Sequence, residues 1–161
     1  MSFYTNGNTT AATSINSDGD VKANSFVSNL PNIYFGTTGS QTCSAGGVVQ
    51  FTANTVNPQG LYTPSSHTFT PQFKCYVEVF ASMVQVSSGS VAVNLFVYKN
   101  GGNTNIDLLW VGPGGTNNIN PSGSGRTVLL CNAGEALTIR SKYACSISSG
   151  NVMYKILETN I

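Results

Sequence analysis

Hydrophobic and polar residues alternate with a period of two along much of the chain after residue 70. The stretch CYVEVFASMVQV, which begins at Cys75, places small and apolar side chains at every second position, and VAVNLFVYKNG, which begins at Val91, repeats the pattern. Because successive side chains of a strand point to opposite faces, both stretches are predicted to be strands. The breaker Ser87-Ser88-Gly89 separates them. We therefore predict that they pair as a hairpin.

Five more stretches combine β-branched or aromatic residues with flanking Gly, Pro, Asn or Ser. They cover residues 47–53, 106–111, 127–131, 136–143 and 152–158. Only residues 133–137 resemble a helical stretch, and they are too few to form one. Many short strands with turns at intervals of about 8 to 12 residues are typical of all-β sandwiches and jelly rolls. The sequence thus predicts an all-β protein.

The first forty residues differ from the rest because they contain no long apolar run. SFYTN at residues 2–6 returns as SFVSN at residues 25–29, which is a weak internal repeat. Short strands of this kind cannot bury a core alone, so the segment either remains a flexible tail or pairs with copies of itself from other chains. Both interpretations stay open. We predict a stalk or attachment segment over residues 1–40 and a head domain over residues 41–161.

Asp18-Gly19-Asp20 resembles the opening of a calcium-binding loop. An EF-hand loop continues with further oxygen ligands and ends on a bidentate Glu at its twelfth position. Here Val21 and Lys22 follow instead, and no such Glu is present. A plain glycine turn explains the motif, and we predict no metal site and no cofactor.

Composition excludes several classes of function. Only 8% of the 161 residues are charged, and the net charge is +1, so the chain offers no basic surface for nucleic acid. No apolar run approaches 18 residues, and no charged segment precedes an apolar one at the N-terminus. We therefore expect no membrane insertion and no secretory signal.

The four cysteines, Cys43, Cys75, Cys131 and Cys145, lie at least fourteen residues apart. That spacing excludes zinc sites built from paired CxxC motifs. Three of the four sit in apolar stretches, where an unpaired cysteine behaves as a small hydrophobic residue. We expect free buried thiols, with two disulfides as the alternative in an oxidising compartment.

The sequence provides no catalytic framework. The single histidine, His67, lies in a turn-rich stretch, and no G-x-S-x-G motif occurs. Glu78 and Glu135 are carboxylates within the strand-rich region, and nothing in their spacing matches the facing pair that a glycosidase needs. We predict a protein that is not an enzyme and has no catalytic residues.

Residues 49–157 resemble a known family of trimeric jelly rolls. NPQGLYTPSSHTFTPQFKCYVEVFASM, beginning at Asn57, resembles the signature of complement 1q globular heads, which belong to the tumour-necrosis-factor-like class. NLFVYKNG, TVLLCNAGEALTIRS and VMYKILE resemble later strands of that family, in the same order. The resemblance covers about two thirds of the chain. It implies a jelly-roll β-sandwich of ten strands in the head, above the stalk-like segment.

The resemblance also implies a homotrimer, in which one sheet of each subunit packs against two neighbours about a threefold axis. Aromatic residues at candidate strand positions are the candidates for that interface. They are Tyr76, Phe80, Phe96 and Tyr154. Alternation alone does not show which strand face points towards the axis.

For ligand contact the most informative stretch is KNGGNTNIDLLWVGPGGTNNINPSGSGR, residues 99–126. It contains the only tryptophan, Trp110, followed by the asparagines Asn117, Asn118 and Asn120. An aromatic ring beside amide side chains is the usual chemistry for binding sugars. Trp110 also follows two leucines, so the alternative is that it belongs to the core and that the asparagines only form turns.

Together these features predict a virion structural protein: a trimeric fibre tip or spike on the virion surface. Its head would contact a glycan or protein of the host surface, and its N-terminal segment would contact other virion proteins. Two alternatives are an architectural decoration or cement protein of a capsid and a secreted bacterial glycan-binding adhesin. A glycan-cleaving enzyme is the weakest alternative.

Overall fold

The computed structural model describes residues 13–15, 21–23, 33–56, 60–86, 92–113 and 120–158. The chain divides into two units, Met1–Leu30 and Pro31–Ile161. In the first unit, β1 (Thr13–Ile15) pairs antiparallel with β2 (Val21–Ala23). Asp18-Gly19-Asp20 lies outside the described residues. The second unit is the head, and every regular element described in it is a strand, as predicted.

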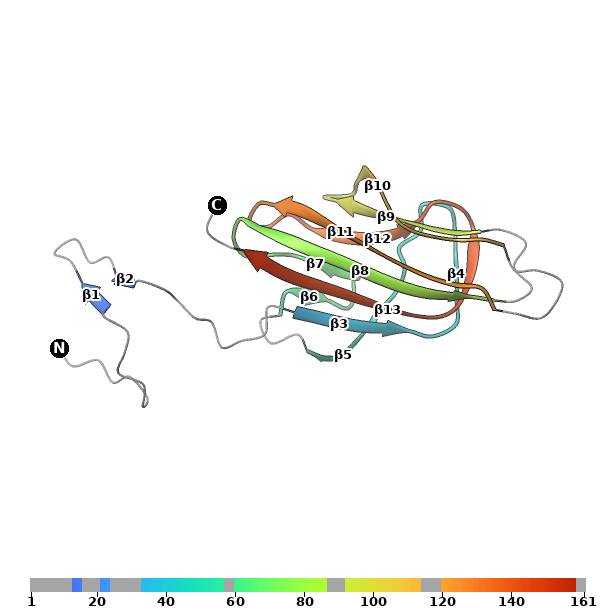
Figure 1. Cartoon of the computed structure of the whole chain (residues 1–161), viewed down its shortest axis with the longest axis horizontal. Coiled ribbons are helices and arrows are strands. Elements are labelled where there is room, and N and C mark those ends of the chain that lie inside the picture. The colour runs from blue at the N-terminus through green and yellow to red at the C-terminus, as the bar shows by residue number, and fades with distance from the viewer. Residues whose placement is uncertain are drawn as a thin grey trace. The chain divides into compact units, whose positions relative to one another are not determined.

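The head consists of two antiparallel sheets (Figure 1). The six-stranded sheet has the order β11-β8-β13-β3-β5, with β4 paired to β13 beside that path. Its strands are β3 (Ile33–Thr38), β4 (Gln41–Cys43), β5 (Thr52–Val56), β8 (Cys75–Gln85), β11 (Ser122–Cys131) and β13 (Cys145–Glu158). The longest two, β8 and β13, run side by side, and Figure 1 shows them in green and red.

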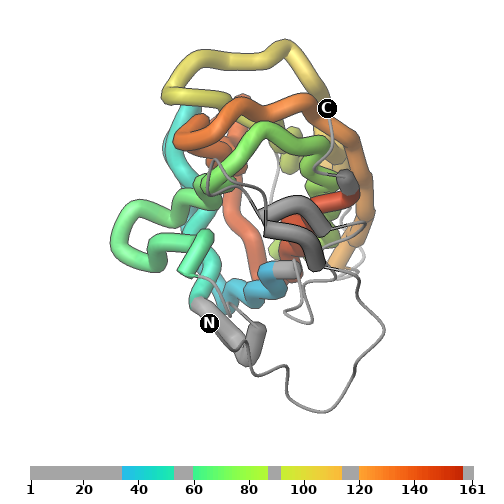
Figure 2. The backbone as a smooth tube through the Cα atoms, turned by 90° about the vertical axis from the view of Figure 1, so that its left-hand side faces the viewer, coloured from blue at the N-terminus to red at the C-terminus, as the bar shows by residue number. Residues whose placement is uncertain are grey.

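The five-stranded sheet has the order β10-β9-β12-β7-β6. Its strands are β6 (Tyr62–Thr63), β7 (Thr68–Phe69), β9 (Val93–Lys99), β10 (Gly102–Val111) and β12 (Leu137–Ser141). Figure 2 shows the head nearly along its strands, with the chain passing repeatedly around a shared interior. The two sheets together form the predicted sandwich.

Alternate residues of each sheet fill the space between the sheets. Along β8, every second side chain from Cys75 to Gln85 is buried, while the side chains between them are exposed or half-buried. Three tyrosines and a phenylalanine form the aromatic centre of this core: Tyr34 stacks on Tyr62 at 3.8 Å, and Phe69 stacks on Tyr154 at 4.8 Å between ring centroids. Alternation of polar and apolar residues therefore builds the interior as the sequence indicated.

The predicted hairpin between residues 75–86 and 91–98 is wrong. β8 pairs with β11 and β13, whereas β9 pairs with β10 and β12, so the two strands belong to different sheets. Breaker residues mark the end of a strand, but they do not determine which partner the next strand takes.

The domain boundary predicted after residue 40 falls too late. β3, which lies within the predicted stalk segment, pairs with β13 on one side and β5 on the other. Tyr34, from the same strand, is buried in the core. The head therefore begins at Pro31. The strand predicted over residues 47–53 also differs from the structure. Val48 makes only an isolated bridge to Arg140, and β5 begins at Thr52.

Two glycines of β11 let the sheets approach closely at one edge. A Cβ at Gly125 would overlap the carbonyl oxygen of Leu108 in β10, and a Cβ at Gly123 would lie 2.9 Å from Cγ2 of Val111. β10 and β11 belong to opposite sheets, so the absence of side chains at these positions closes this edge of the sandwich.

Candidate functional site

The outward side of the six-stranded sheet carries a row of apolar side chains. Phe35, Met153 and Phe80 are directly opposite one another across β3, β13 and β8. Tyr76 lies four residues before Phe80 in β8 and is opposite Leu130, and the side chains of Tyr76 and Leu130 are 37% and 42% exposed. With Val128, which is 49% exposed, these residues form what we call the apolar face. It consists of Phe35, Tyr76, Phe80, Val128, Leu130 and Met153.

Charged groups lie within the apolar face. Glu78 stands opposite Val128 on one side and opposite Lys155 on the other. Its carboxylate accepts a hydrogen bond from Arg126 at 3.4 Å. Most of the Arg126 side chain is exposed, so this ion pair contributes little to stability, but it neutralises the carboxylate in an otherwise apolar surface.

The same sheet changes character towards the other end of β8. A hollow of about 350 Å³ lies there, and hydroxyl and amide groups dominate its lining, among them Ser82, Ser122, Ser124, Ser149 and Asn151. The outward side of the sheet is thus apolar at the beginning of β8 and polar at its end.

Tyr76 and Phe80, two of the four residues predicted for the trimer interface, point outward from the apolar face. Tyr154 does not, because its ring is completely buried in the core of the subunit and stacks on Phe69. Phe96 lies in the other sheet and is only 6% exposed, with the Lys142 ammonium 5.0 Å from its ring centroid. Tyr154 is therefore not available at the surface of the subunit, whereas the assignment of Phe96 to an interface stays a prediction.

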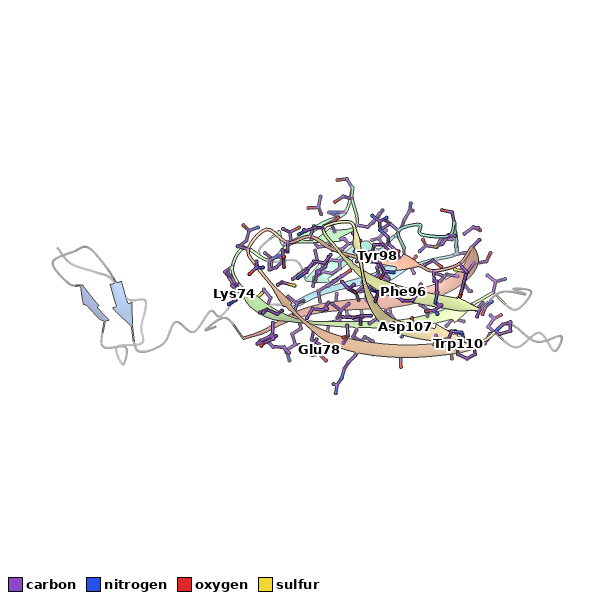
Figure 3. All side chains as sticks on the ribbon, turned by 90° about the horizontal axis from the view of Figure 1, so that it is seen from above. Lys74, Glu78, Phe96, Tyr98, Asp107 and Trp110 are labelled. Carbon is purple, nitrogen blue, oxygen red and sulfur yellow. The ribbon has the colours of Figure 1, made fainter. Side chains whose placement is uncertain are left out.

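A second candidate surface lies on the outward side of the five-stranded sheet. Trp110 is 64% exposed, which excludes the interpretation that it belongs to the core. It stands opposite Asn94 of β9, and Asp107 stands opposite Phe96. Figure 3 labels Phe96, Asp107 and Trp110, which lie near one another on this part of the head. We call Asn94, Phe96, Asp107, Trp110 and Lys142 the tryptophan face.

A β-bulge brings the two exposed β10 side chains of this surface together. Asp107 and Trp110 are three residues apart, so in a regular strand they would point to opposite sides. The register shifts between Asp107 and Leu109, and both Leu108 and Leu109 are buried. Leu108 is the extra residue of the bulge, and it returns Trp110 to the side that Asp107 occupies.

Among the described residues, two polar side chains of the tryptophan face lack a hydrogen bond or an ion pair that they could make. The side-chain oxygen of Asn94 is buried and has no hydrogen-bond partner in the part of the chain that the structure describes. Within the same residues, the ion pairs are Lys99 with Glu135 and Arg126 with Glu78, so the Asp107 carboxylate is in neither. An exposed indole on the same side of the strand as a carboxylate provides a stacking surface and a polar group for hydroxyl-rich ligands.

Other predicted site residues take different positions. Asn120 is exposed two residues before β11, whereas Asn117 and Asn118 lie outside the described residues. Much of the region 99–126 is not loop, because β10 and β11 occupy Gly102–Val111 and Ser122–Cys131. Asn94, Asp107 and Lys142 were missed by sequence analysis. The strand register places Asn94 opposite Trp110, the bulge brings Asp107 to the same side, and the Lys142 ammonium lies over the Phe96 ring.

The described residues contain no cluster of metal-binding side chains. No group of three His, Cys, Asp or Glu side chains that could hold a metal ion occurs among them. His67 is half-buried in a turn with φ of 52°, and its Nδ1 lies 3.2 Å from the carbonyl oxygen of Phe51. This histidine anchors the turn to the neighbouring segment. The described part of the chain also lacks any helix of the length and hydrophobicity that crossing a bilayer requires.

Comparison with known proteins agrees with this architecture. No family model matches the sequence, and neither does any curated protein. Among solved structures, the globular domain of zebrafish complement 1qA superimposes with a TM-score of 0.60 at 13% identity, over 81% of this chain and 99% of that one. The head is a complement 1q and tumour-necrosis-factor-like jelly roll.

Two further structures of this jelly-roll type are similar. Eiger TNF from S. frugiperda has a TM-score of 0.53 at 14% identity, over 83% of this chain and 97% of that one. Murine APRIL has a TM-score of 0.51 at 11% identity, over 76% of this chain and 98% of that one. The resemblance found in the sequence is confirmed at the level of the fold. A shared fold does not by itself determine what a domain binds.

Proposed function

We propose that this protein is a virion structural protein without enzymatic activity, the homotrimeric tip of a fibre or spike, whose head contacts the host cell surface. The observation that carries the proposal is the apolar face on one sheet of a complement 1q and tumour-necrosis-factor-like jelly roll. The weakly repetitive, polar N-terminal segment supports a stalk, and the tryptophan face supports a binding surface. The resulting protein would be displayed on the outside of the particle.

Two further copies of this chain are the proposed occupants of the apolar face. The side chains of this surface span β3, β13, β8 and β11, so they form a continuous band across the sheet. Interfaces of permanent oligomers are large and apolar, with aromatic residues enriched and charged residues depleted at the centre. In the family that the sequence resembles, one sheet of each subunit faces the threefold axis. We assign that role to the six-stranded sheet.

Native mass spectrometry of the full chain tests the assembly. We expect a trimer for the natural sequence and a monomer for the double variant Tyr76→Glu/Leu130→Glu, because two opposing carboxylates would be placed in an apolar contact. Tyr143→Glu is the matched control. It should leave the trimer intact, because Tyr143 is an exposed aromatic residue that belongs to neither face. A monomeric natural chain at micromolar concentration would contradict the proposal.

The tryptophan face is the proposed contact with the host surface, and a saccharide is the ligand that its chemistry favours. A sugar ring can stack its C–H groups on the Trp110 indole while its hydroxyls bond to the Asp107 carboxylate. Three identical sites on one trimer act together through effective concentration, so each site needs only weak affinity.

Binding of the trimer to immobilised neutral and acidic oligosaccharides tests this contact. Trp110→Ala should reduce binding at least about tenfold, the loss expected when a stacking contact of about 1.4 kcal/mol disappears. Trp110→Phe should retain part of the affinity, and Phe73→Ala, which removes an exposed ring outside both faces, should have no effect. If Trp110→Ala binds as well as the natural chain, the tryptophan face is not the contact.

A further inference from the structure

The four cysteines form two directly opposed pairs across antiparallel strands. Cys43 of β4 is the partner of Cys145 at the first residue of β13. Cys75 at the first residue of β8 is the partner of Cys131 at the last residue of β11. All four are buried thiols, as the sequence analysis expected. The sequence did not indicate that they would be matched in register, because the members of each pair are 102 and 56 residues apart.

Directly opposed positions of an antiparallel pair satisfy the geometric requirement for a disulfide. Side chains of opposed residues point to the same side of the sheet, and their Cα atoms are about 4.5 or 5.5 Å apart, depending on the hydrogen-bonding pattern. Disulfides join residues whose Cα atoms are about 4.4 to 6.8 Å apart. Both cysteine pairs therefore fall within the permitted range without movement of the backbone.

The surroundings of the first pair favour reaction between its own two sulfur atoms. Interaction between the two thiols lowers the pKa of Cys145, while the same interaction and burial raise the pKa of Cys43. The Ser141 Oγ lies 3.1 Å from the Cys145 Sγ, and the Cys43 Sγ lies 3.6 Å from the Gln41 side-chain oxygen. Cys145 is thus the thiol that ionises more readily, and its neighbour in the interior is Cys43.

The second pair is more deeply enclosed. Cys75 and Cys131 are completely buried, and burial raises the pKa of both thiols, that of Cys131 to about 11. Their enclosure keeps other chains away, so an oxidised Cys75 has Cys131 as its nearest partner. Formation of a bridge here requires a small oxidant or an opening of the sheet end.

We propose that the head is the site of two intrachain disulfides, Cys43–Cys145 and Cys75–Cys131, which form when the protein meets a small-molecule disulfide such as oxidised glutathione. In each pair one thiolate attacks the oxidant and releases one glutathione thiol. The second cysteine then displaces the attached glutathione, so a bridge forms, two glutathione thiols are produced, and the protein loses two hydrogens.

The two bridges would lie at opposite ends of the six-stranded sheet, and each would link two neighbouring strands covalently. Cys145 begins β13, whereas the last residue of β13, Glu158, stands opposite Tyr76, next to Cys75. One bridge thus joins β4 to the start of β13, and the other joins β8 to β11 beside its end. Both close long loops of the chain, which is the situation in which a disulfide most restricts the unfolded state. This inference does not depend on the proposed host contact.

Intact-mass measurement and peptide mapping test the pairing. The full chain is reduced, unfolded in urea and refolded in a buffer of reduced and oxidised glutathione, so that burial does not block the reaction. We expect the mass to fall by about 4 Da, two hydrogens for each bridge, and disulfide-linked peptides that join Cys43 to Cys145 and Cys75 to Cys131. Either of the other two connectivities, bridges between chains, or four unreacted thiols in the refolded protein would overturn the proposal.

Matched double variants separate the two bridges. Cys43→Ala/Cys145→Ala should retain only the Cys75–Cys131 bridge, and Cys75→Ala/Cys131→Ala only the other one. Oxidation should raise the melting temperature of the natural chain by at least about 5 °C and that of each double variant by less. The comparison of oxidised with reduced forms of the same variant removes the effect of the lost side chains. An oxidised natural chain that melts at the temperature of the reduced one would show that these bridges do not stabilise the native register.

Discussion

At the scale of single residues, the Tyr154 hydroxyl is a buried polar group without a hydrogen-bond partner among the described residues. The ring packs in the aromatic centre of the core, and burial raises the pKa of the phenol. Removing the hydroxyl while keeping the ring should therefore leave stability unchanged or increase it. We predict that Tyr154→Phe unfolds at an equal or higher urea concentration than the natural chain.

Tyr62→Phe is the comparison for this prediction. The Tyr62 hydroxyl donates a hydrogen bond of 3.3 Å to the carbonyl oxygen of Phe51, so its loss should cost about 1 kcal/mol. If Tyr154→Phe were the more damaging of the two, the Tyr154 hydroxyl would have to make an interaction that the described residues do not provide.

Glu135 gives the clearest pH dependence. Its carboxylate accepts a hydrogen bond of 2.9 Å from the Asn132 backbone N–H and lies 3.0 Å from the Lys99 ammonium, and these contacts lower its pKa. Because the pKa is lower in the folded than in the unfolded chain, the stabilisation is present above the ordinary carboxyl pKa of about 4.3 and is lost as the pH falls through the folded value.

Glu135→Gln should therefore cost less than about 1 kcal/mol at neutral pH, since the pair is near the surface. The difference from the natural chain should disappear in acid. Urea unfolding at a series of pH values measures this, and a difference that stays constant into acid would exclude the carboxylate charge as its cause.

Residue type was a better guide to the side chains of the candidate surfaces than to where those side chains lie in the fold. Trp110 was identified from its type alone, and the structure exposes it. Tyr76 and Tyr154 were indistinguishable in the sequence because both are aromatic residues in alternating stretches. Alternation shows which residues share a face, but only the paired sheet shows whether that face is covered. Tyr154 is covered by the opposite sheet, and Tyr76 is not.

At the scale of elements, the close approach of β10 and β11 depends on glycine. An added methyl group at Gly125 would overlap backbone atoms of Leu108, which cannot move independently of the strand. We predict that Gly125→Ala costs more than about 2 kcal/mol through overpacking. Gly123→Ala is the control: it meets a Val111 methyl group first, which can adjust, so the loss should be smaller. Urea unfolding that ranks the two variants in the opposite order would contradict this account.

Most strands were predictable because their apolar residues alternate, as in β8. The unpredicted parts share a cause, which is that tertiary contacts determined them. β3 is short, and its role as a central strand depends on its pairing with β13 and β5. The first half of β11 is rich in Ser and Gly, which favour turns, but it pairs with β8 along its whole length. β-strand propensity is too weak to reveal such segments.

At the scale of the whole molecule, the head unit has its own core and the N-terminal unit contributes no described strand to its sheets. We predict that a chain lacking residues 1–29 still folds with the same far-UV circular dichroism, all-β in character. If the N-terminal segment is the attachment to the particle, this shortened head should fail to assemble onto particles and should still compete with them for host cells. A shortened head that competes poorly but still assembles onto particles would favour an architectural decoration protein.

The β-bulge at Leu108 has a consequence for how this surface can change over evolution. A single-residue deletion in a strand normally reverses every side chain beyond it. Loss of Leu108 is the exception, because Asp107 and Trp110 would then be two residues apart in a regular strand and would still point to the same side, opposite Phe96 and Asn94. Substitutions at the exposed positions of β10 could alter the proposed ligand contact step by step, whereas the bulge is the place where the strand could lose one residue without reversing Trp110. We therefore expect natural variants of this head to differ in the side chains around Trp110 and, where the length of β10 differs, to lack one of the two leucines between Asp107 and Trp110.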